Sequence, residues 1–503
     1  MRRPLLIALL FIHLFSFSQN WVEMGDDVQL RISSNGIIAI NQNDLSPASE
    51  FQNSGNHFLN QMGMWISARD ESNALHTSIQ MLNNKGEYDF SYGPLDTIVS
   101  QPDTSGWNKV WYINSSDVKY HQENYANVGY TVPESIANWP GENKSGDFVQ
   151  YLAPFADINQ NNTYDPENGD YPFIKGDEAV YVICNDNSFE HKVSGGLPLG
   201  LEVHLMIYKT SSAPNTYFME YYLINRLDFD YHDIQIGMFL SGACGNEEDN
   251  YALTSISHNT IGIYNGDNYD EGGFGDQLPY VFCRFLNREL TGSIVFENTD
   301  NPINGIPQNA LEYNYFLHSR WRNSDKIQFG NDGQTNSEDY PFMFAQDTDP
   351  QKNEWKEESV SEPGFRMILG RTSFNQLEEG GYLKLDFALG YGFYDSSEKV
   401  LPIIHDESEK SKTVFNAVTS VKPVLTDNVR IYPQPSSGIF NLGGLTAGNY
   451  KLFISDIQGN TLYEEDFFTI GTYQCNVLLP PGIYTIQLVN QGQMINKLLI
   501  IRP

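Results

Sequence analysis

Four apolar runs between residues 178 and 242 are the strongest constraint on how this chain can fold. They are seven to ten residues long, rich in valine, isoleucine, tyrosine and phenylalanine, and separated by glycine, proline, asparagine and aspartate. The runs are Glu178–Cys184, Leu201–Tyr208, Thr216–Asn225 and Ile234–Gly242. This composition and spacing predict antiparallel strands joined by turns. Thr216–Asn225 is apolar on both faces, so we expect it to be a central strand between two layers.

Similar runs lie on both sides of this segment. They are Gly63–Asp70, Leu75–Leu82, Trp107–Asn114, Phe365–Gly370 and Tyr382–Gly392, and Asp27–Ile40 has the pattern of a hairpin with an Asn-Gly turn. Helical signals are confined to Ser115–Tyr125 and Pro133–Asn138. Residues 287–363 are irregular and predict long loops. The prediction is therefore an all-β fold, with a large antiparallel β-sandwich-like main domain over residues 19–404.

The chain begins with the pattern of a secretory signal peptide, which we assign to residues 1–18. Arg2 and Arg3 precede an apolar run over Leu5–Phe17, and small serines come just before Gln19. No other apolar stretch reaches the length needed to span a bilayer, so we expect no transmembrane span. Export permits disulfides among the four cysteines, whose spacing indicates neither a zinc motif nor a redox motif.

The charge balance excludes one class of partner. The chain has 30 basic and 63 acidic residues, a formal net charge of -33. Such an excess repels the phosphates of nucleic acids and favours cations. We therefore expect no nucleic-acid partner.

A second, more regular pattern begins at Val429. Seven short apolar runs separated by turns fill the remainder of the chain and predict a small immunoglobulin-like β-sandwich over residues 429–503. Residues 405–428 carry mixed charge without a clear period, and we predict that they form a linker between the two domains.

Four segments of this C-terminal block carry a family resemblance. IYPQPSSGIF, ISDIQGN, PPGIYTIQL and the terminal KLLII resemble, in that order, the type A sorting domain of the type IX secretion system. Gln434 departs from the family, which usually has asparagine there. The positions that the resemblance implies for recognition and folding are Tyr432, Pro433, Pro435, Asp456, Gly459, Gly482, Tyr484 and Lys497. The alternative is an ordinary adhesive immunoglobulin-like module.

The resemblance also implies where the protein works and what it meets on the way. Proteins of this family cross the outer membrane through the type IX translocon, which reads the C-terminal domain. A C-terminal signal peptidase then removes that domain, and the cargo is released or linked to a surface glycolipid. The expected location is therefore secreted or on the outer cell surface.

The segment DINQNNTYDPENGDYP predicts a calcium site. Oxygen-bearing side chains recur at alternate positions, as in EF-hand-type loops, and a further carboxylate is needed to close the shell. The proposed ligands are Asp157, Asn159, Asn161, Thr163, Asp165 and Asp170. Asn168 stands where such loops usually have the closing glutamate. The alternative is a metal-free loop of Asx-turns. A second acidic run, Asn246–Asn250 with Asp267, Asp270 and Glu271, is either a cation site or a solvated loop.

Catalytic motifs for phosphoryl transfer, dinucleotide redox chemistry and common hydrolases are absent from the sequence. The favoured hypothesis for the main domain is a non-catalytic, calcium-stabilised binding or adhesion module for a glycan or a protein. The alternative is a polysaccharide-active hydrolase that uses Glu202 and Glu220, because such an enzyme needs only two suitably spaced carboxylates.

Overall fold

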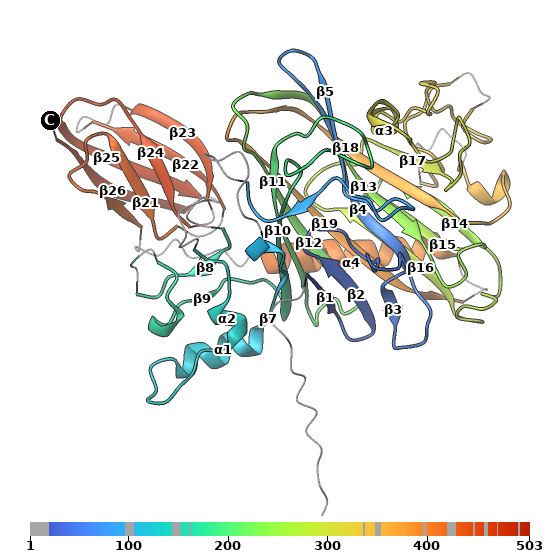
Figure 1. Ribbon diagram of the computed structural model, residues 1–503, viewed down its shortest axis with the longest axis horizontal. Coiled ribbons are helices and arrows are strands. Elements are labelled where there is room, and N and C mark those ends of the chain that lie inside the picture. Colours follow the sequence, from blue (N-terminus) through green and yellow to red (C-terminus); the bar gives the residue numbers. More distant parts are fainter. Residues whose placement is uncertain are drawn as a thin grey trace, which may run out of the picture.

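The computed structural model describes residues 20–502 except 96–104, 143–151, 160, 162, 335–337, 348–353, 396–398, 420–428, 446–447, 457–460, 470 and 491–492 (Figure 1). The predicted signal peptide lies outside the described residues. Strands make up most of the structure and all pair antiparallel within their sheets, which confirms the all-β prediction. Within the described part of the chain, no helix combines the length and the apolar character needed to cross a membrane.

The main domain is built on a nine-stranded sheet. In spatial order its strands are β14 (Asn250–Ser255), β15 (Thr260–Asn265), β16 (Leu278–Phe285), β19 (Tyr382–Tyr394), β12 (Thr216–Asn225), β11 (Leu201–Lys209), β10 (Glu178–Asn185) and β6 (Ser91–Tyr92), and β7 (Trp111–Asn114) also pairs with β10. The predicted central strand, β12, lies between β11 and β19 and is buried along most of its length.

A five-stranded sheet packs against it. Its order is β17 (Gly292–Phe296), β18 (Met367–Leu377), β13 (Tyr231–Gly242), β4 (Leu59–Asp70) and β5 (Leu75–Ile79). Val203, Leu205 and Met219 from the large sheet share one core with Met64 and Ile236 from the smaller one, and all five side chains are fully buried. Burying each such side chain contributes about 1.5–3 kcal/mol. The two sheets therefore form the predicted sandwich.

Smaller elements surround the sandwich. They are the three-stranded sheet β1 (Trp21–Met24), β2 (Val28–Ser33) and β3 (Ser49–Phe51), the pair β8 (Phe155–Ala156) and β9 (Tyr171–Pro172), the helices α1 (Ser115–Asn124), α2 (Glu134–Ala137) and α3 (Ala310–Phe316), and the short 3-10 turns Ser105–Trp107, Pro166–Asn168 and Glu357–Ser359. Both predicted helices are confirmed. The predicted Asn-Gly turn within Asp27–Ile40 is present, because Ile32 and Ile38 form an antiparallel bridge and the N–H of Ser33 donates to the Ile37 carbonyl at 3.0 Å. The second arm is not a regular strand, and β2 pairs along its length with β1 and β3.

The linker prediction is wrong for residues 405–419, which belong to a helix, α4 (Val400–Thr419), that packs on β16 and β19. Its buried stripe consists of Ile404, Ser408, Ser411 and Phe415, spaced by four, three and four residues. Two of these four residues are serines, so the helical spacing of the buried positions is not visible as a pattern of apolar residues. Ser408 lies 2.9 Å from the Thr260 hydroxyl, so its polar group is satisfied in the packed helix.

The region from 244 to 363 also contains more regular structure than its acidic, glycine-rich sequence predicted. β14, β15 and β16 form the edge of the large sheet, and β17 and α3 lie within the segment predicted as loops. The strands are short and interrupted by polar turns, so local pattern alone did not separate them from loops.

The C-terminal block forms a second sandwich, drawn in red in Figure 1. One sheet holds β20 (Arg430–Tyr432), β21 (Ile439–Gly443) and β24 (Tyr473–Asn476). The other holds β23 (Thr461–Thr469), β22 (Gly448–Ser455), β25 (Gly482–Asn490) and β26 (Gln493–Ile501). Phe440, Leu452, Ile454 and Ile486 are fully buried between the two sheets. Seven strands therefore form here, as predicted.

Candidate functional site

The predicted calcium loop is compact and holds its own polar groups. The Asp170 carboxylate accepts hydrogen bonds from the backbone N–H groups of Ile158 and Asp165, at 2.8 and 3.0 Å. The side chain of Asp170 is fully buried, and this burial raises its pKa to about 7. Asp170 thus ties the two ends of the loop together.

Three asparagine side chains in the loop converge on one carboxylate. The amide groups of Asn159, Asn161 and Asn168 all lie within 2.8–3.1 Å of Asp165. Burial opposes the effect, but the hydrogen bonds from Asn168 and its neighbours keep the pKa of Asp165 below its usual value. Amide oxygen and nitrogen exchange places on rotation, so the same side chains can present oxygens toward this carboxylate. A hard cation such as Ca²⁺ prefers such a donor set, and the residues fit it.

The same loop also contains the Asx-turns of the metal-free alternative. The N–H of Asn161 donates to Asp157 Oδ1 at 3.1 Å, and the N–H of Thr163 donates to Asn161 Oδ1 at 2.8 Å. Both patterns occur together in oxygen-rich calcium loops, because the turns orient the side chains. The geometry is therefore compatible with both interpretations.

Glu202, the first proposed catalytic carboxylate, is held in an ion-pair network. It is fully buried and lies 2.6 Å from Arg226 Nη2 and 2.8 Å from His204 Nε2. The N–H of Leu95 donates to its second oxygen at 2.8 Å. Burial alone would raise the pKa of Glu202, but the Arg226 guanidinium and His204 outweigh it and hold the pKa at about 2. Glu202 is therefore ionised at neutral pH and held by its ion-pair partners.

Glu220, the second candidate, lies between two lysines. Lys175 forms a short ion pair with one oxygen, and Lys384 Nζ lies 3.8 Å from the other. Burial opposes the effect, but the two lysines lower the pKa of Glu220, so it is not a general acid. Lys384 also contacts Asp386 at 3.0 Å, and burial beside Glu220 raises the pKa of Asp386.

The two glutamates are not brought together as a catalytic pair. Glu202 is paired across β11 and β12 with Ile224, whereas Glu220 is paired with Met206. The carboxylates therefore lie four residues apart along the paired strands, which corresponds to roughly 13 Å. Glycosidases hold their two carboxylates at about 5–10 Å. This geometry does not suit the hydrolase alternative.

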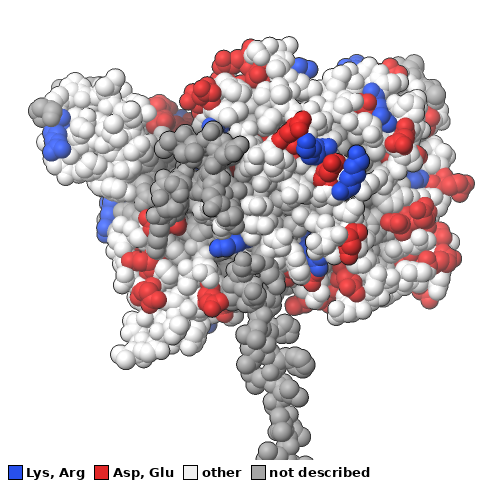
Figure 2. All heavy atoms as spheres, in the orientation of Figure 1, with Lys and Arg blue, Asp and Glu red and all other residues white. Residues whose placement is uncertain are grey.

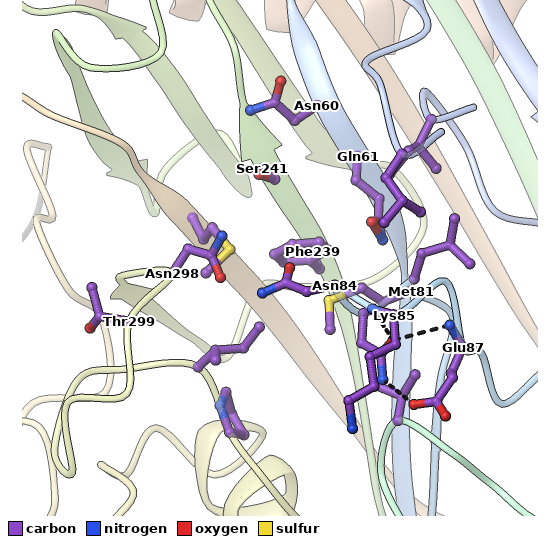
Figure 3. A pocket seen from close by; sticks show the side chains of 18 of the residues that line it. Asn60, Gln61, Met81, Asn84, Lys85, Glu87, Phe239, Ser241, Asn298 and Thr299 are labelled. Carbon is purple, nitrogen blue, oxygen red and sulfur yellow. Dashed lines mark hydrogen bonds between the residues drawn. The ribbon is translucent and has the colours of Figure 1, made fainter. Parts of the chain in front are cut away.

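A pocket with a volume of about 710 Å³ lies against β4 and β13 (Figure 3). The segment 81–87 borders it on one side, and residues 298–308 border it on the other. Many of its lining side chains carry amide or hydroxyl groups. These include Asn60, Gln61, Asn83, Asn84, Ser241, Asn298, Thr299 and Gln308. No sequence motif predicts this pocket, because its lining residues come from segments far apart in the chain.

Two polar atoms beside this pocket lack protein partners within the described part of the chain. They are Asn60 Oδ1 and Gln61 Nε2, and both are buried. The other end of the Asn60 amide donates to Glu247 at 2.8 Å, and the Asn83 amide donates to Glu87 at the same distance. Asn60 Oδ1 and Gln61 Nε2 are covered by protein and are not open to the pocket, and a buried polar group without a partner costs about 1–3 kcal/mol. The pocket is lined by amides, whereas the carboxylates of Glu247 and Glu87 beside it are already hydrogen-bonded.

The acidic run near residue 250 forms a separate cluster. Ligand oxygens of Asp249, Asp267 and Glu271 lie within 4.8 Å of one another. Burial, reinforced by Asp270, raises the pKa of Asp249 to about 7, and its Oδ1 has no partner among the described residues. Asp270 instead accepts hydrogen bonds from Asn246 and Phe274 and holds the adjoining turn. Figure 2 shows acidic side chains gathered along the right-hand edge of this face, whereas acidic and basic side chains lie side by side near its centre.

The positions assigned to the sorting domain lie mainly in or beside its strands. Tyr432 ends β20, and Pro433 and Pro435 follow it in cis peptide bonds. Gly482 begins β25, and the buried Tyr484 in that strand donates from its hydroxyl to the Pro480 carbonyl at 2.6 Å. Asp456 directly follows β22. Lys497 lies on β26, where it is paired with Ile486 of β25. Gly459 lies outside the described residues.

Residues 430–502 match the family described as the secretion system C-terminal sorting domain. The protein is a type IX secretion cargo. It is therefore secreted or displayed at the cell surface, and its sorting domain engages the secretion machinery. The alternative of an ordinary adhesive module at this end of the cargo is set aside by the match.

The comparison with solved structures adds no functional argument for the cargo. A polysaccharide lyase aligns with 60% of this chain and 34% of its own length, at 7% identity and a TM-score of 0.20. The aligned part thus spans about a third of that lyase. No curated protein matches the cargo sequence.

One of the contacts between the sorting domain and the main domain of the cargo is aromatic. Phe468 on β23 lies 4.4 Å from Tyr222 and 4.3 Å from Tyr382, measured between ring centroids. Lys384 Nζ lies 5.6 Å from the centre of the Tyr222 ring. The contact therefore lies above the charged group formed by Glu220, Lys384 and Asp386.

Proposed function

We propose that the main domain of this cargo is a non-catalytic, calcium-stabilised module that binds a glycan in the pocket beside β4 and β13. The observation that carries the proposal is the lining of this pocket by amide and hydroxyl side chains, among them Asn60, Gln61 and Asn298. Amide groups donate and accept hydrogen bonds, and sugar hydroxyls do both as well, so they complement this lining.

The charges around the pocket favour a neutral ligand. Lys192 pairs with Glu190 at 2.6 Å, and Glu87 and Glu247 accept hydrogen bonds from asparagine amides. These neighbours satisfy three of the charged groups that line the pocket, Lys85 and Asp300 being the other two, and amides and hydroxyls make up most of its polar lining. Glu202 and Glu220 are four residues apart along their paired strands, so the specific carboxylate pair of the hydrolase alternative is not assembled, which supports binding over hydrolysis.

Calcium has a structural role in this proposal. Asp157, Asn159, Asn161, Thr163, Asp165 and Asp170 would hold the ion, which would supply a fixed positive charge to a loop rich in oxygen donors. The loop carries the β8–β9 pair, and the carboxylate of Asp170 joins its two ends. The ion would therefore stabilise the surface beside α1 and α2 without contacting the pocket.

Processing completes the proposed path of the cargo. The C-terminal signal peptidase would cut between α4 and β20 after passage through the translocon. The main domain, including α4, would then be released or linked to a surface glycolipid. Its acidic surface would keep it apart from nucleic acids and anionic membranes.

Glycan-array screening of the purified cargo, followed by calorimetry with the best oligosaccharide, tests the binding proposal. We expect Gln61→Leu to weaken binding by 10-fold or more, because a buried hydrogen bond to a ligand contributes roughly 1–3 kcal/mol. Gln376→Leu, on the distant end of β18, is the matched control and should bind normally. Equal affinity of both variants, or cleavage of the oligosaccharide by the unmodified cargo, would contradict the proposal.

A further inference from the structure

Three segments far apart in the sequence bring two histidines and an aspartate together. His258 lies in the turn between β14 and β15, Asp347 follows the segment that pairs with Thr254, and His405 lies on α4. One ligand atom from each of the three side chains lies within 4.8 Å of the other two. This cluster is separate from the pocket and from the calcium loop.

The distances match a small coordination sphere. Asp347 Oδ2 lies 3.6 Å from His258 Nδ1 and 3.6 Å from His405 Nε2. The ligand atoms of a tetrahedral zinc site lie about 3.4 Å apart, because each is about 2.1 Å from the metal. The two imidazole rings are stacked, with centroids 3.9 Å apart and planes 21° apart, so the rings must tilt from this arrangement to direct both nitrogens at one ion.

Neighbouring groups fix the orientation of the three side chains. The N–H of Ile256 donates to Asp347 Oδ1 at 2.8 Å, and the Ser255 hydroxyl donates to Asp347 Oδ2 at 2.7 Å. On the far side of the His258 ring, Nε2 lies 3.9 Å from Glu409 Oε1. A carboxylate in that position is the usual outer partner of a metal-bound imidazole.

We propose that His258, Asp347 and His405 bind one divalent transition metal ion, with zinc as the preferred ion. Two imidazole nitrogens and one carboxylate oxygen are the donors that zinc takes, whereas calcium prefers oxygen alone. The two histidine side chains are 21% exposed and that of Asp347 is 12% exposed. The Ser255 hydroxyl lies 2.7 Å from Asp347 Oδ2, 3.1 Å from His258 Nδ1 and 3.0 Å from His405 Nε2, so it is the group placed to supply a fourth donor.

The ion would have a specific structural effect. It would cross-link α4 to the β14–β15 turn and to the segment that carries Asp347. α4 is the last described element before the sorting domain. The metal would thus hold the end of the main domain in place at the point where the sorting domain is attached.

Calorimetric titration of the mature, full-length cargo with zinc chloride tests this inference. The protein carries no histidine tag and is first treated with chelator to remove bound metal. It is then kept in excess calcium, so that sites with oxygen ligands alone are already occupied. We expect one zinc ion per chain, with at least a 100-fold loss of affinity in His405→Ala and in His258→Ala. His318→Ala, which removes a partly exposed histidine elsewhere on the main domain, should bind as the unmodified chain does.

A second measurement keeps the test decisive if one variant fails to fold. Cobalt(II) should give the intense visible absorption of a tetrahedral site in the unmodified chain and in Asp157→Ala. The absorption should be lost in Asp347→Asn, which keeps the size of the side chain. Absence of zinc binding, or binding that persists in the folded variants of all three residues, would overturn the inference. Neither result would affect the glycan proposal, which depends on Gln61.

Discussion

The main domain and the sorting domain differ most in what they bury. The main domain encloses charged side chains in networks, among them Glu202, Glu220 and Asp386. In the described part of the sorting domain, the buried polar side chains are the uncharged Ser436, Thr469 and Asn490. Buried charges are costly unless fully paired, and a small sandwich folds without them. The contrast indicates that the main domain depends on specific ion pairs to stabilise its buried charges, whereas the described part of the sorting domain buries no charge.

The two domains also differ in how their sheets are covered. Strands of the sorting domain alternate between buried and exposed positions, as in β25. Strands of the main domain, such as β11, are buried throughout. One face of each sorting-domain sheet is therefore available to the secretion machinery, while helices and loops cover the large sheet on its outer face.

Arg226→Ala should have the largest effect on the difference in stability between the two domains. This change leaves the carboxylate of Glu202 buried without its main partner, which typically costs about 3–5 kcal/mol. Thermal and urea unfolding should show the loss in the main domain alone, with the sorting-domain transition unchanged. Lys326→Ala breaks an ion pair whose two partners are each 52% exposed, so it should cost less than about 1 kcal/mol. Equal effects of the two changes would contradict the contrast.

The same network predicts how stability depends on pH. The folded-state pKa of Glu202 is about 2, below the ordinary value of 4.5. Its stabilising contribution is therefore present above about pH 4.5 and is lost as the pH falls toward 2. Unfolding measured from pH 6 to pH 2 should show a smaller acid-induced loss in Arg226→Ala than in the unmodified chain. An unchanged slope would contradict the role assigned to this pair.

An intermediate effect is expected from calcium removal. If calcium is present at 100 times its dissociation constant, it stabilises the main domain by about 2.7 kcal/mol. Chelation should therefore lower the melting temperature of that domain by several degrees, and Asp157→Ala should abolish the response. Asp325→Ala, an exposed aspartate in another turn, should keep it. A melting temperature that does not change with chelator would support the metal-free loop.

The two domains also differ in how well the sequence predicted their structure. The sorting domain was predicted strand by strand, because each of its strands alternates in polarity and its turns contain glycine, proline or asparagine. The central strands of the main domain were also predicted, since β12 is apolar on both faces. These features depend on neighbouring residues only.

The features that were missed depend on contacts between distant segments. α4 escaped because Ser408 and Ser411 occupy its buried stripe, and their hydroxyl groups find partners only in the packed structure. The pocket combines Gln61 with Asn298, and the histidine cluster combines His258 with His405. Glu202 and Glu220 were paired as catalytic groups because each is central in its strand, whereas strand register places them apart.

The smallest expected effect concerns the contact between the two domains. Phe468→Ala removes the ring that stacks on Tyr222 and Tyr382, and aromatic pairs contribute about 0.5–1.5 kcal/mol each. Small-angle scattering should show a larger radius of gyration, while both domains keep their melting temperatures. Leu462→Ala, on the exposed part of the same strand, should leave the scattering unchanged. An unchanged radius for Phe468→Ala would mean that other contacts hold the domains together.

Export from the native bacterium is the most direct measurement of what the C-terminal domain does. A chain that ends at Thr419 keeps the main domain and α4 but lacks the sorting domain. It should accumulate inside the cell envelope, while a reporter placed between residues 1–18 and residues 420–503 should reach the cell surface or the medium. Arrival of the shortened chain outside the cell at the level of the full chain would contradict the assignment of this protein as a type IX cargo.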